Sequence, residues 1–114
     1  MSKKLEPIII DAANKSLGRL STEVATALRG KNKVTFQPNI MCSDIVKVIN
    51  IAKVKLTGKK STQKIYRHYT GYPGGLKTQK VAVFTPAQLL KKALDDMLPK
   101  NRTRKKILKR LIIE

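Results

Sequence analysis

Residues 7–30, PIIIDAANKSLGRLSTEVATALRG, decide the fold of this chain. The β-branched run at 8–10 shows no alternation of polar and apolar residues, which is typical of a strand buried on both faces, as in a parallel sheet. Apolar residues then recur at helical spacing over 17–29, with Ser16 placed to begin the helix and Gly30 to end it. A strand that leads directly into a helix is the opening of a βα unit.

The next segments extend this unit into a sheet. Residues 44–50, DIVKVIN, form a second β-branched run, and two buried strands that flank a helix predict a right-handed crossover and a parallel pair. Residues 51–56 alternate apolar and charged side chains, which indicates a third strand or strand-like segment with one solvent-exposed face. The short apolar patch at 81–84 is compatible with an edge strand.

Two further helices are predicted near the C-terminus. Thr85, Pro86 and Gln88 make a strong helix start, and the apolar face that follows belongs to the core. Residues 100–110, KNRTRKKILKR, carry a narrow apolar stripe among many cations. Such a helix repels itself when free, so we expect it to become well ordered only against phosphate.

The net charge of the chain limits the kinds of partner that it can bind. Its 114 residues predict one domain, and 25 Lys and Arg against 7 Asp and Glu give a formal net charge of +18. Self-repulsion at this charge destabilises the compact state unless an anion neutralises it, so a polyanion is the expected partner. The sequence has no long apolar span and no amphipathic segment with large apolar residues facing a basic side, so nucleic acid is favoured over a membrane.

The sequence contains no motif for a metal site, a nucleotide site or a disulfide. A single cysteine, Cys42, and a single histidine, His68, cannot make a disulfide or a zinc site, and Cys42 is interpreted as a small buried hydrophobe. Residues 11–18 lack the G-x-G-x-x-G spacing, and 57–61, TGKKS, lack the P-loop spacing. The N-terminal stretch does not read as a signal peptide, so a reducing, cytosolic setting is expected.

The most distinctive stretch is 64–80, KIYRHYTGYPGGLKTQK, which holds all three tyrosines and the only histidine. Rings that stack on bases, interleaved with cations that meet phosphates, suit a single-stranded or irregular nucleic-acid surface. Its glycines around Pro73 allow positive φ and close approach to a partner, which predicts an exposed binding loop. The alternative is an ordinary tight turn whose tyrosines complete a small core.

Seven motifs in order, spanning nearly the whole chain, resemble the large-subunit ribosomal protein L-thirteen family. They are Asp11-Ala12-Ala13, Leu17-Gly18-Arg19-Leu20, Leu28-Arg29-Gly30-Lys31, Val48-Ile49-Asn50, Leu56-Thr57-Gly58-Lys59-Lys60, Thr70-Gly71-Tyr72-Pro73-Gly74-Gly75-Leu76-Lys77 and Met97-Leu98-Pro99-Lys100-Asn101. The resemblance implies a three-layer α/β/α domain around a mainly parallel four-stranded sheet. It also implies a non-catalytic protein of the large subunit that binds rRNA beside neighbouring ribosomal proteins and joins early in assembly.

Basic and aromatic side chains in three regions are the expected RNA contacts. They are Arg29, Lys31, Lys33, Lys59, Lys60, Lys64, Tyr66, Arg67, His68, Tyr69, Lys77, Lys100, Arg102, Arg104 and Lys105. Alternatives stay open: the cations at 29–33 also suit a helix C-terminus, and those at 59–64 also suit a solvated turn.

Two other function classes are the alternatives. An RNA-modifying enzyme with His68 as general base lacks a second titratable partner near it. A stand-alone RNA-binding regulator cannot be told from a ribosomal protein by composition.

Overall fold

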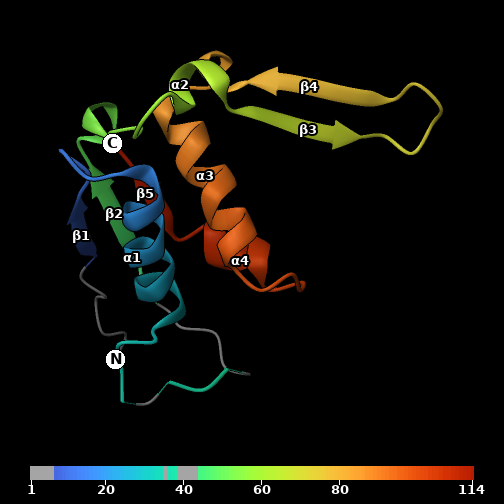
Figure 1. Cartoon of the computed structure of the whole chain (residues 1–114). Helices are drawn as coiled ribbons and strands as arrows, with labels where there is room; N and C mark the ends of the chain where they lie inside the picture. The colour runs from blue at the N-terminus through green and yellow to red at the C-terminus, as the bar shows by residue number, and fades with distance from the viewer. Residues whose placement is uncertain (1–6, 35, 39–43) are drawn as a thin grey trace.

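The computed structural model describes residues 7–34, 36–38 and 44–114, with the side chains of 60 and 61 left out (Figure 1). Cys42, expected to be buried, lies outside the described residues. Three parallel strands form the main sheet in the order β1-β2-β5: β1 (Ile8–Asp11), β2 (Val46–Ile49) and β5 (Leu111–Ile113). The register sets Ile10 beside Val48 and Val48 beside Ile113. The predicted parallel pair is therefore confirmed, and β5 is a strand that the sequence reasoning missed.

Helix α1 (Leu17–Arg29) has the predicted bounds. Gly30 ends it in the left-handed conformation, φ 72°, and donates its backbone N–H to Ala27 O. Ser16 occupies the N-cap position, although its side chain makes no capping hydrogen bond. Ser21, a polar residue buried in the core, donates its hydroxyl to Leu17 O at 2.7 Å, which satisfies this hydroxyl inside the helix.

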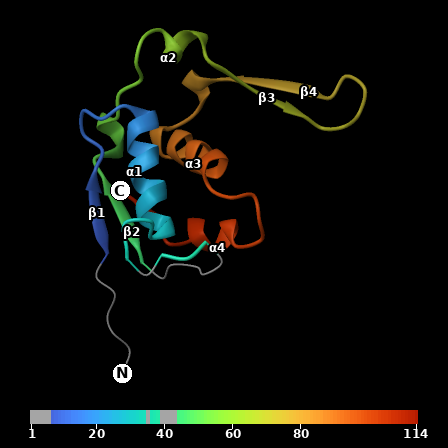
Figure 2. The same cartoon turned by 60° about the horizontal axis from the view of Figure 1, so that its bottom comes forward.

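Helix α3 (Pro86–Met97) also begins as predicted. Thr85 Oγ1 accepts from the backbone N–H of Gln88, and the Gln88 side chain accepts from the backbone N–H of Thr85. This reciprocal capping box fixes the helix start. The helix packs on α1, and α1, α3 and α4 (Arg104–Leu108) lie on the same side of the sheet (Figures 1 and 2).

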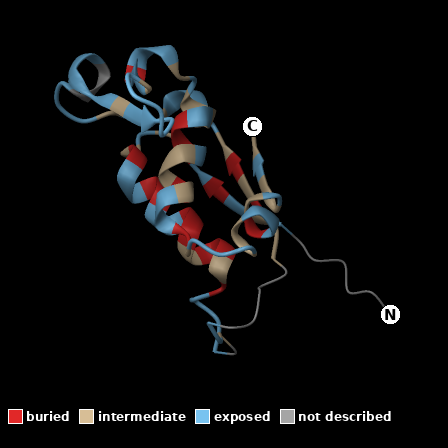
Figure 3. Cartoon of the chain, turned by 90° about the vertical axis from the view of Figure 1, so that its right-hand side faces the viewer, coloured by how far each residue is buried: buried red, intermediate tan, exposed pale blue. Residues whose placement is uncertain are grey.

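The core lies between that helical layer and one face of the sheet. Buried side chains come from the inward positions of the strands, such as Ile10, Val46 and Val48, and from α1 and α3 (Figure 3). The opposite face of the sheet is open: Ile9 is 62% exposed and Ile112 is 45% exposed. The expectation that the first strand is buried on both faces is therefore wrong, since no helix covers this face among the described residues. The observed class is mixed α/β, with a parallel three-stranded sheet and an antiparallel pair.

Two predicted strands are short 3₁₀ turns instead. The strand predicted at 51–56 begins instead as the 3₁₀ turn η1 (Ile51–Lys53), which follows Asn50 in the left-handed conformation, φ 58°. Within 51–56 only Lys55 makes a β-bridge, and its partner is Ser16. The expected edge strand at 81–84 is η2 (Val81–Val83). Val81 is buried at 3% exposure, so the chain turns into the core there instead of running along a sheet edge.

The stretch expected as an exposed binding loop is an ordered hairpin. Strands β3 (Ile65–Tyr69) and β4 (Leu76–Lys80) pair antiparallel and project away from the helical body, and the short helix α2 (Lys60–Gln63) lies at their root (Figures 1 and 2). The hairpin strands are almost entirely exposed, in agreement with the predicted exposure of this stretch. A Cβ on Gly75 would lie 2.9 Å from the carbonyl oxygen of Tyr72, so the hairpin end requires glycine there.

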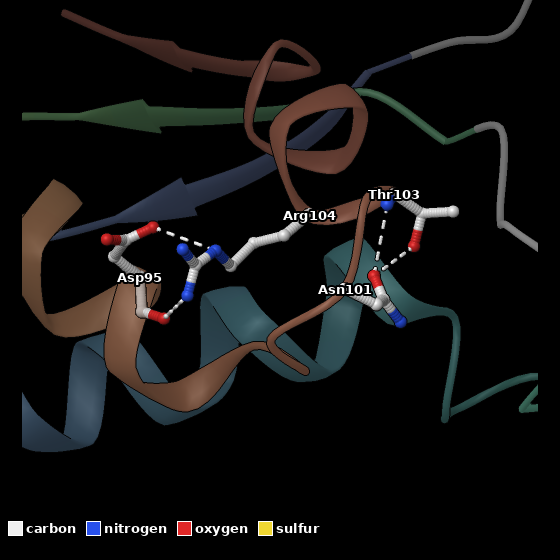
Figure 4. A network of polar contacts seen from close by, with 4 residues as sticks. All are labelled: Asp95, Asn101, Thr103 and Arg104. Carbon is white, nitrogen blue, oxygen red and sulfur yellow. Dashed lines mark hydrogen bonds and ion pairs between the residues drawn. The ribbon is translucent and has the colours of Figure 1, made fainter.

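Helix α4 is shorter than the predicted 100–110 segment. Asn101 Oδ1 accepts from both the backbone N–H and the hydroxyl of Thr103, which forms a turn before the helix begins at Arg104 (Figure 4). Ile107 is buried at 7% exposure and anchors the helix to the core. The expected dependence of its order on phosphate stays a prediction.

Candidate nucleic-acid interface

The hairpin has two chemically different faces because side chains alternate along each strand. We define the outer hairpin face as the alternating, cross-strand-paired positions Ile65, Arg67, Tyr69, Leu76, Thr78 and Lys80. It is rich in exposed large apolar groups: Ile65 is 43%, Leu76 is 57% and Tyr69 is 61% exposed. The other face carries Tyr66, His68, Lys77 and Gln79, with His68 opposite Lys77.

The charge along this part of the chain has one sign. Between Asp44 and Asp95 the sequence contains eleven Lys and Arg and no Asp or Glu. The whole hairpin and its root fall inside this interval. Exposed cations without carboxylates produce a positive field that attracts a polyanion and repels acidic partners.

Tyr66, predicted as a stacking residue, is engaged by the protein itself. Its ring meets the Phe84 ring edge to face, with centroids 5.4 Å apart. The ammonium groups of Lys64 and Lys92 lie 5.1 Å and 5.0 Å from its centroid. The ring is half-buried against the core, so for this tyrosine the structure favours the alternative of a residue that completes the core.

Arg104 is likewise held by the fold. Its Nε lies 3.2 Å from Asp95 Oδ1, and a terminal nitrogen donates to the Asp95 backbone carbonyl at 3.2 Å (Figure 4). These contacts join α4 to α3 across the turn that contains Pro99. A structural role therefore accompanies, or replaces, the predicted role in RNA binding.

The cations that follow α1 are partly engaged in the same way. The Arg29 guanidinium lies 5.6 Å from the centroid of the Phe36 ring, and Lys33 Nζ lies 2.6 Å from Asp44 Oδ2. Lys31 is exposed. This cluster follows the C-terminus of α1, at the end opposite the hairpin (Figure 1).

The remaining predicted contacts whose side chains are described are exposed, and the structure does not bring them together in one patch. Lys59 and Lys64 lie at the hairpin root, and the backbone of Lys60 belongs to α2 although its side chain is not described. Arg67, His68, Tyr69 and Lys77 lie on the hairpin, whereas Lys100, Arg102 and Lys105 lie near α4. Cations thus face solvent in three separate regions of the molecule.

A basic groove between α3 and α4 was missed by the sequence reasoning. Lys91, Lys92, Lys105 and Lys109 line it together with Asp95, around a volume of about 620 Å³. Only Lys105 was predicted. The pair Lys91-Lys92 was the available signal, because the turn at Pro99 folds the basic segment back beside that helix.

Asp11, which opens the first family-like motif, has a structural role. Its Oδ1 accepts from the backbone N–H of Ala13 at 2.9 Å and from the Asn50 side-chain amide at 3.1 Å. The hydrogen bond from Ala13, followed by that from Asn50, lowers the pKa of this carboxyl from its ordinary value of 3.8. Asp11 thereby links the ends of β1 and β2.

Two other kinds of site find no support in the described part of the chain. No three His, Cys, Asp or Glu side chains there gather into a metal-binding group. No helix over the same residues has the length and apolarity needed to cross a membrane.

A basic α/β body with a projecting, acid-free hairpin is typical of proteins that bind nucleic acid. The chain belongs to the Ribosomal protein L13 family, whose family model matches residues 5–113. Membership of this family places it among structural, non-enzymatic ribosomal proteins.

Curated relatives agree with this family over most of the chain. Three that carry the name Large ribosomal subunit protein uL13 come from Thermus thermophilus, Syntrophomonas wolfei and Oenococcus oeni, at 46%, 48% and 53% identity. The matches cover 96%, 90% and 82% of this chain and 81%, 74% and 65% of the respective relatives. The chain therefore spans about two thirds of the length of the Oenococcus protein.

Proposed function

We propose that this chain is a structural constituent of the large ribosomal subunit in the cytoplasm, where it binds large-subunit rRNA and supports early subunit assembly. The family match and the names of the relatives support the assignment. The observation that carries the mechanism is the projecting hairpin, which lies inside a stretch with eleven cations and no acid.

Three separated cationic regions suit a protein that fixes RNA segments relative to one another. The hairpin, the turn after α1 and the surface around α4 each offer exposed cations to a different segment. Phosphate contacts position a protein without reading sequence, so the rRNA shape decides where these three regions fit together. Arg67, Lys77, Arg102 and Lys105 are the proposed phosphate contacts, and Tyr69 is the proposed stacking residue.

The same proposal includes the finer architecture of a single three-layer α/β/α domain around a four-stranded sheet. It requires a further strand and a layer over the open face of the sheet, where Ile9 and Ile112 present apolar surface. Neighbouring ribosomal proteins are proposed partners of the assembled particle. A structure of the purified subunit would test both points.

Co-sedimentation distinguishes this function from that of a stand-alone RNA-binding regulator. A tagged copy expressed from its own gene should migrate with the large subunit and its precursors at about one copy per particle. A variant in which Arg67, Lys77 and Lys80 are glutamine should be depleted from early precursors, because the hairpin loses its cations. Sedimentation apart from ribosomal particles would contradict the proposal.

A further inference from the structure

A cleft opens where the hairpin joins the body. It encloses about 500 Å³, within the range of small-ligand sites. Five segments form it: the start of α1, residues 55–57, the root of β3, the start of η2 at Val81, and the second half of α3. Its apolar lining includes Leu56, Val81 and Met97, and its cations are Arg19, Lys55 and Lys64. We call it the root cleft.

The charges of the root cleft are unbalanced. Asp96 is the one carboxylate among its lining residues, against three cations. Among the described residues, Arg19 and Lys55 form no ion pair within 4.0 Å, so their charges are available to an incoming anion. Lys64 Nζ lies over the Tyr66 ring, 5.1 Å from its centroid, and this ring also lines the cleft. An occupant should therefore combine a flat apolar part with a negative charge.

We propose that the root cleft holds one unpaired nucleotide of the rRNA, with its base against Leu56, Val81 and Met97 and its phosphate near Arg19 and Lys55. This inference rests on the proposed function and adds a site that it does not contain. A base inside a duplex is stacked and paired, and only a nucleotide from a loop, bulge or end can enter such a cleft. The dimensions and the paired apolar and cationic walls match that ligand.

The position of the cleft gives the bound nucleotide a mechanical role. One wall belongs to the hairpin root, through Lys64 and Tyr66, and the other walls belong to α1 and α3 of the body. A nucleotide that fills the space between these walls would fix the angle of the projecting hairpin. RNA bound at the root would thus orient the hairpin for its contacts further along the same RNA.

The test compares the unchanged protein with Met97→Trp by base-specific chemical probing of the large-subunit rRNA complex. Met97 is 44% exposed, so a larger ring can be accommodated there and fill the cleft. We expect one unpaired base, protected by the unchanged protein, to become reactive again with Met97→Trp. Affinity should fall about tenfold while backbone protection along the hairpin persists. Met97→Leu is the matched control and should behave as the unchanged protein.

A second variant guards against a folding defect. Arg19→Gln with Lys55→Gln removes two cleft cations, and Lys91→Gln with Lys109→Gln removes two cations from the other groove as its control. The cleft pair should abolish protection of the same single base, and the control pair should keep it. Unchanged base protection in both cleft variants would overturn the proposal. Failure of the unchanged protein to bind rRNA would instead overturn the proposed function itself, which is a separate result.

Discussion

Arg104 contacts Asp95 twice, through Nε to the carboxylate and through a terminal nitrogen to the backbone carbonyl, each at 3.2 Å (Figure 4). Since both contacts cross from α4 to α3, Arg104→Ala should lower the free energy of unfolding by about 1 kcal/mol. Urea denaturation measures this. Lys105→Ala, at an exposed neighbouring position, should stay within about 0.5 kcal/mol of the unchanged protein. Equal stabilities of the two variants would show that the Arg104 contacts are dispensable.

The Tyr66 ring should matter to stability more than its hydroxyl. Tyr66→Ala removes the edge-to-face contact with Phe84 and two cation contacts, and should cost about 2 kcal/mol in unfolding free energy. Tyr66→Phe keeps the ring and should be nearly neutral. Thermal unfolding of both variants tests this, and an alanine variant as stable as the phenylalanine one would contradict the packing role.

Tyr69 should show the opposite behaviour. Its side chain is 61% exposed on the outer hairpin face, so Tyr69→Ala should leave stability within about 0.5 kcal/mol. If a base stacks on it, affinity for the rRNA should fall by about 1–3 kcal/mol. Tyr69→Phe retains a stacking surface and serves as the control. An alanine variant with unchanged affinity and unchanged footprint would remove Tyr69 from the interface.

The lowered pKa of Asp11 should make the free energy of unfolding depend on pH. Its folded-state pKa lies below the ordinary 3.8, so its contribution is present above that pH and is lost as pH falls through the folded value. Between about pH 4 and pH 2, the unfolding free energy of the unchanged protein should therefore fall more steeply than that of Asp11→Asn. Chemical denaturation across this range provides the comparison. Parallel curves would show that the hydrogen bonds from Ala13 and Asn50 do not favour the charged form.

Local signals explain what the sequence could predict. Gly30 adopts positive φ at the end of α1, and the capping box at the start of α3 lies within the four residues Thr85–Gln88. Both helix boundaries are therefore determined by residues at the boundary itself. The pairing of β1 with β2 follows from two adjacent β-branched runs and a crossover helix.

The errors come from features that no local sequence pattern marks. Strand β3 is exposed apart from half-buried Tyr66, so no apolar alternation marked it, and the glycine-rich turn that follows dominated the interpretation. Strand β5 is three residues long and exists because it pairs with β2, about 65 residues earlier in the chain. The roles of Arg104 and Tyr66 depend on Asp95 and Phe84, which only the folded chain places beside them.

The central claim is that cations held on this scaffold bind large-subunit rRNA through phosphates. The most direct measurement is the dissociation constant of the purified protein with that rRNA as a function of salt. The account predicts a linear fall of log affinity with log salt, with a slope of about −0.7 to −0.9 for each neutralised phosphate. It also predicts a shallower slope, by about two to three, when Arg67, Lys77 and Lys80 are glutamine. A flat salt response, or no binding at low ionic strength, would contradict it.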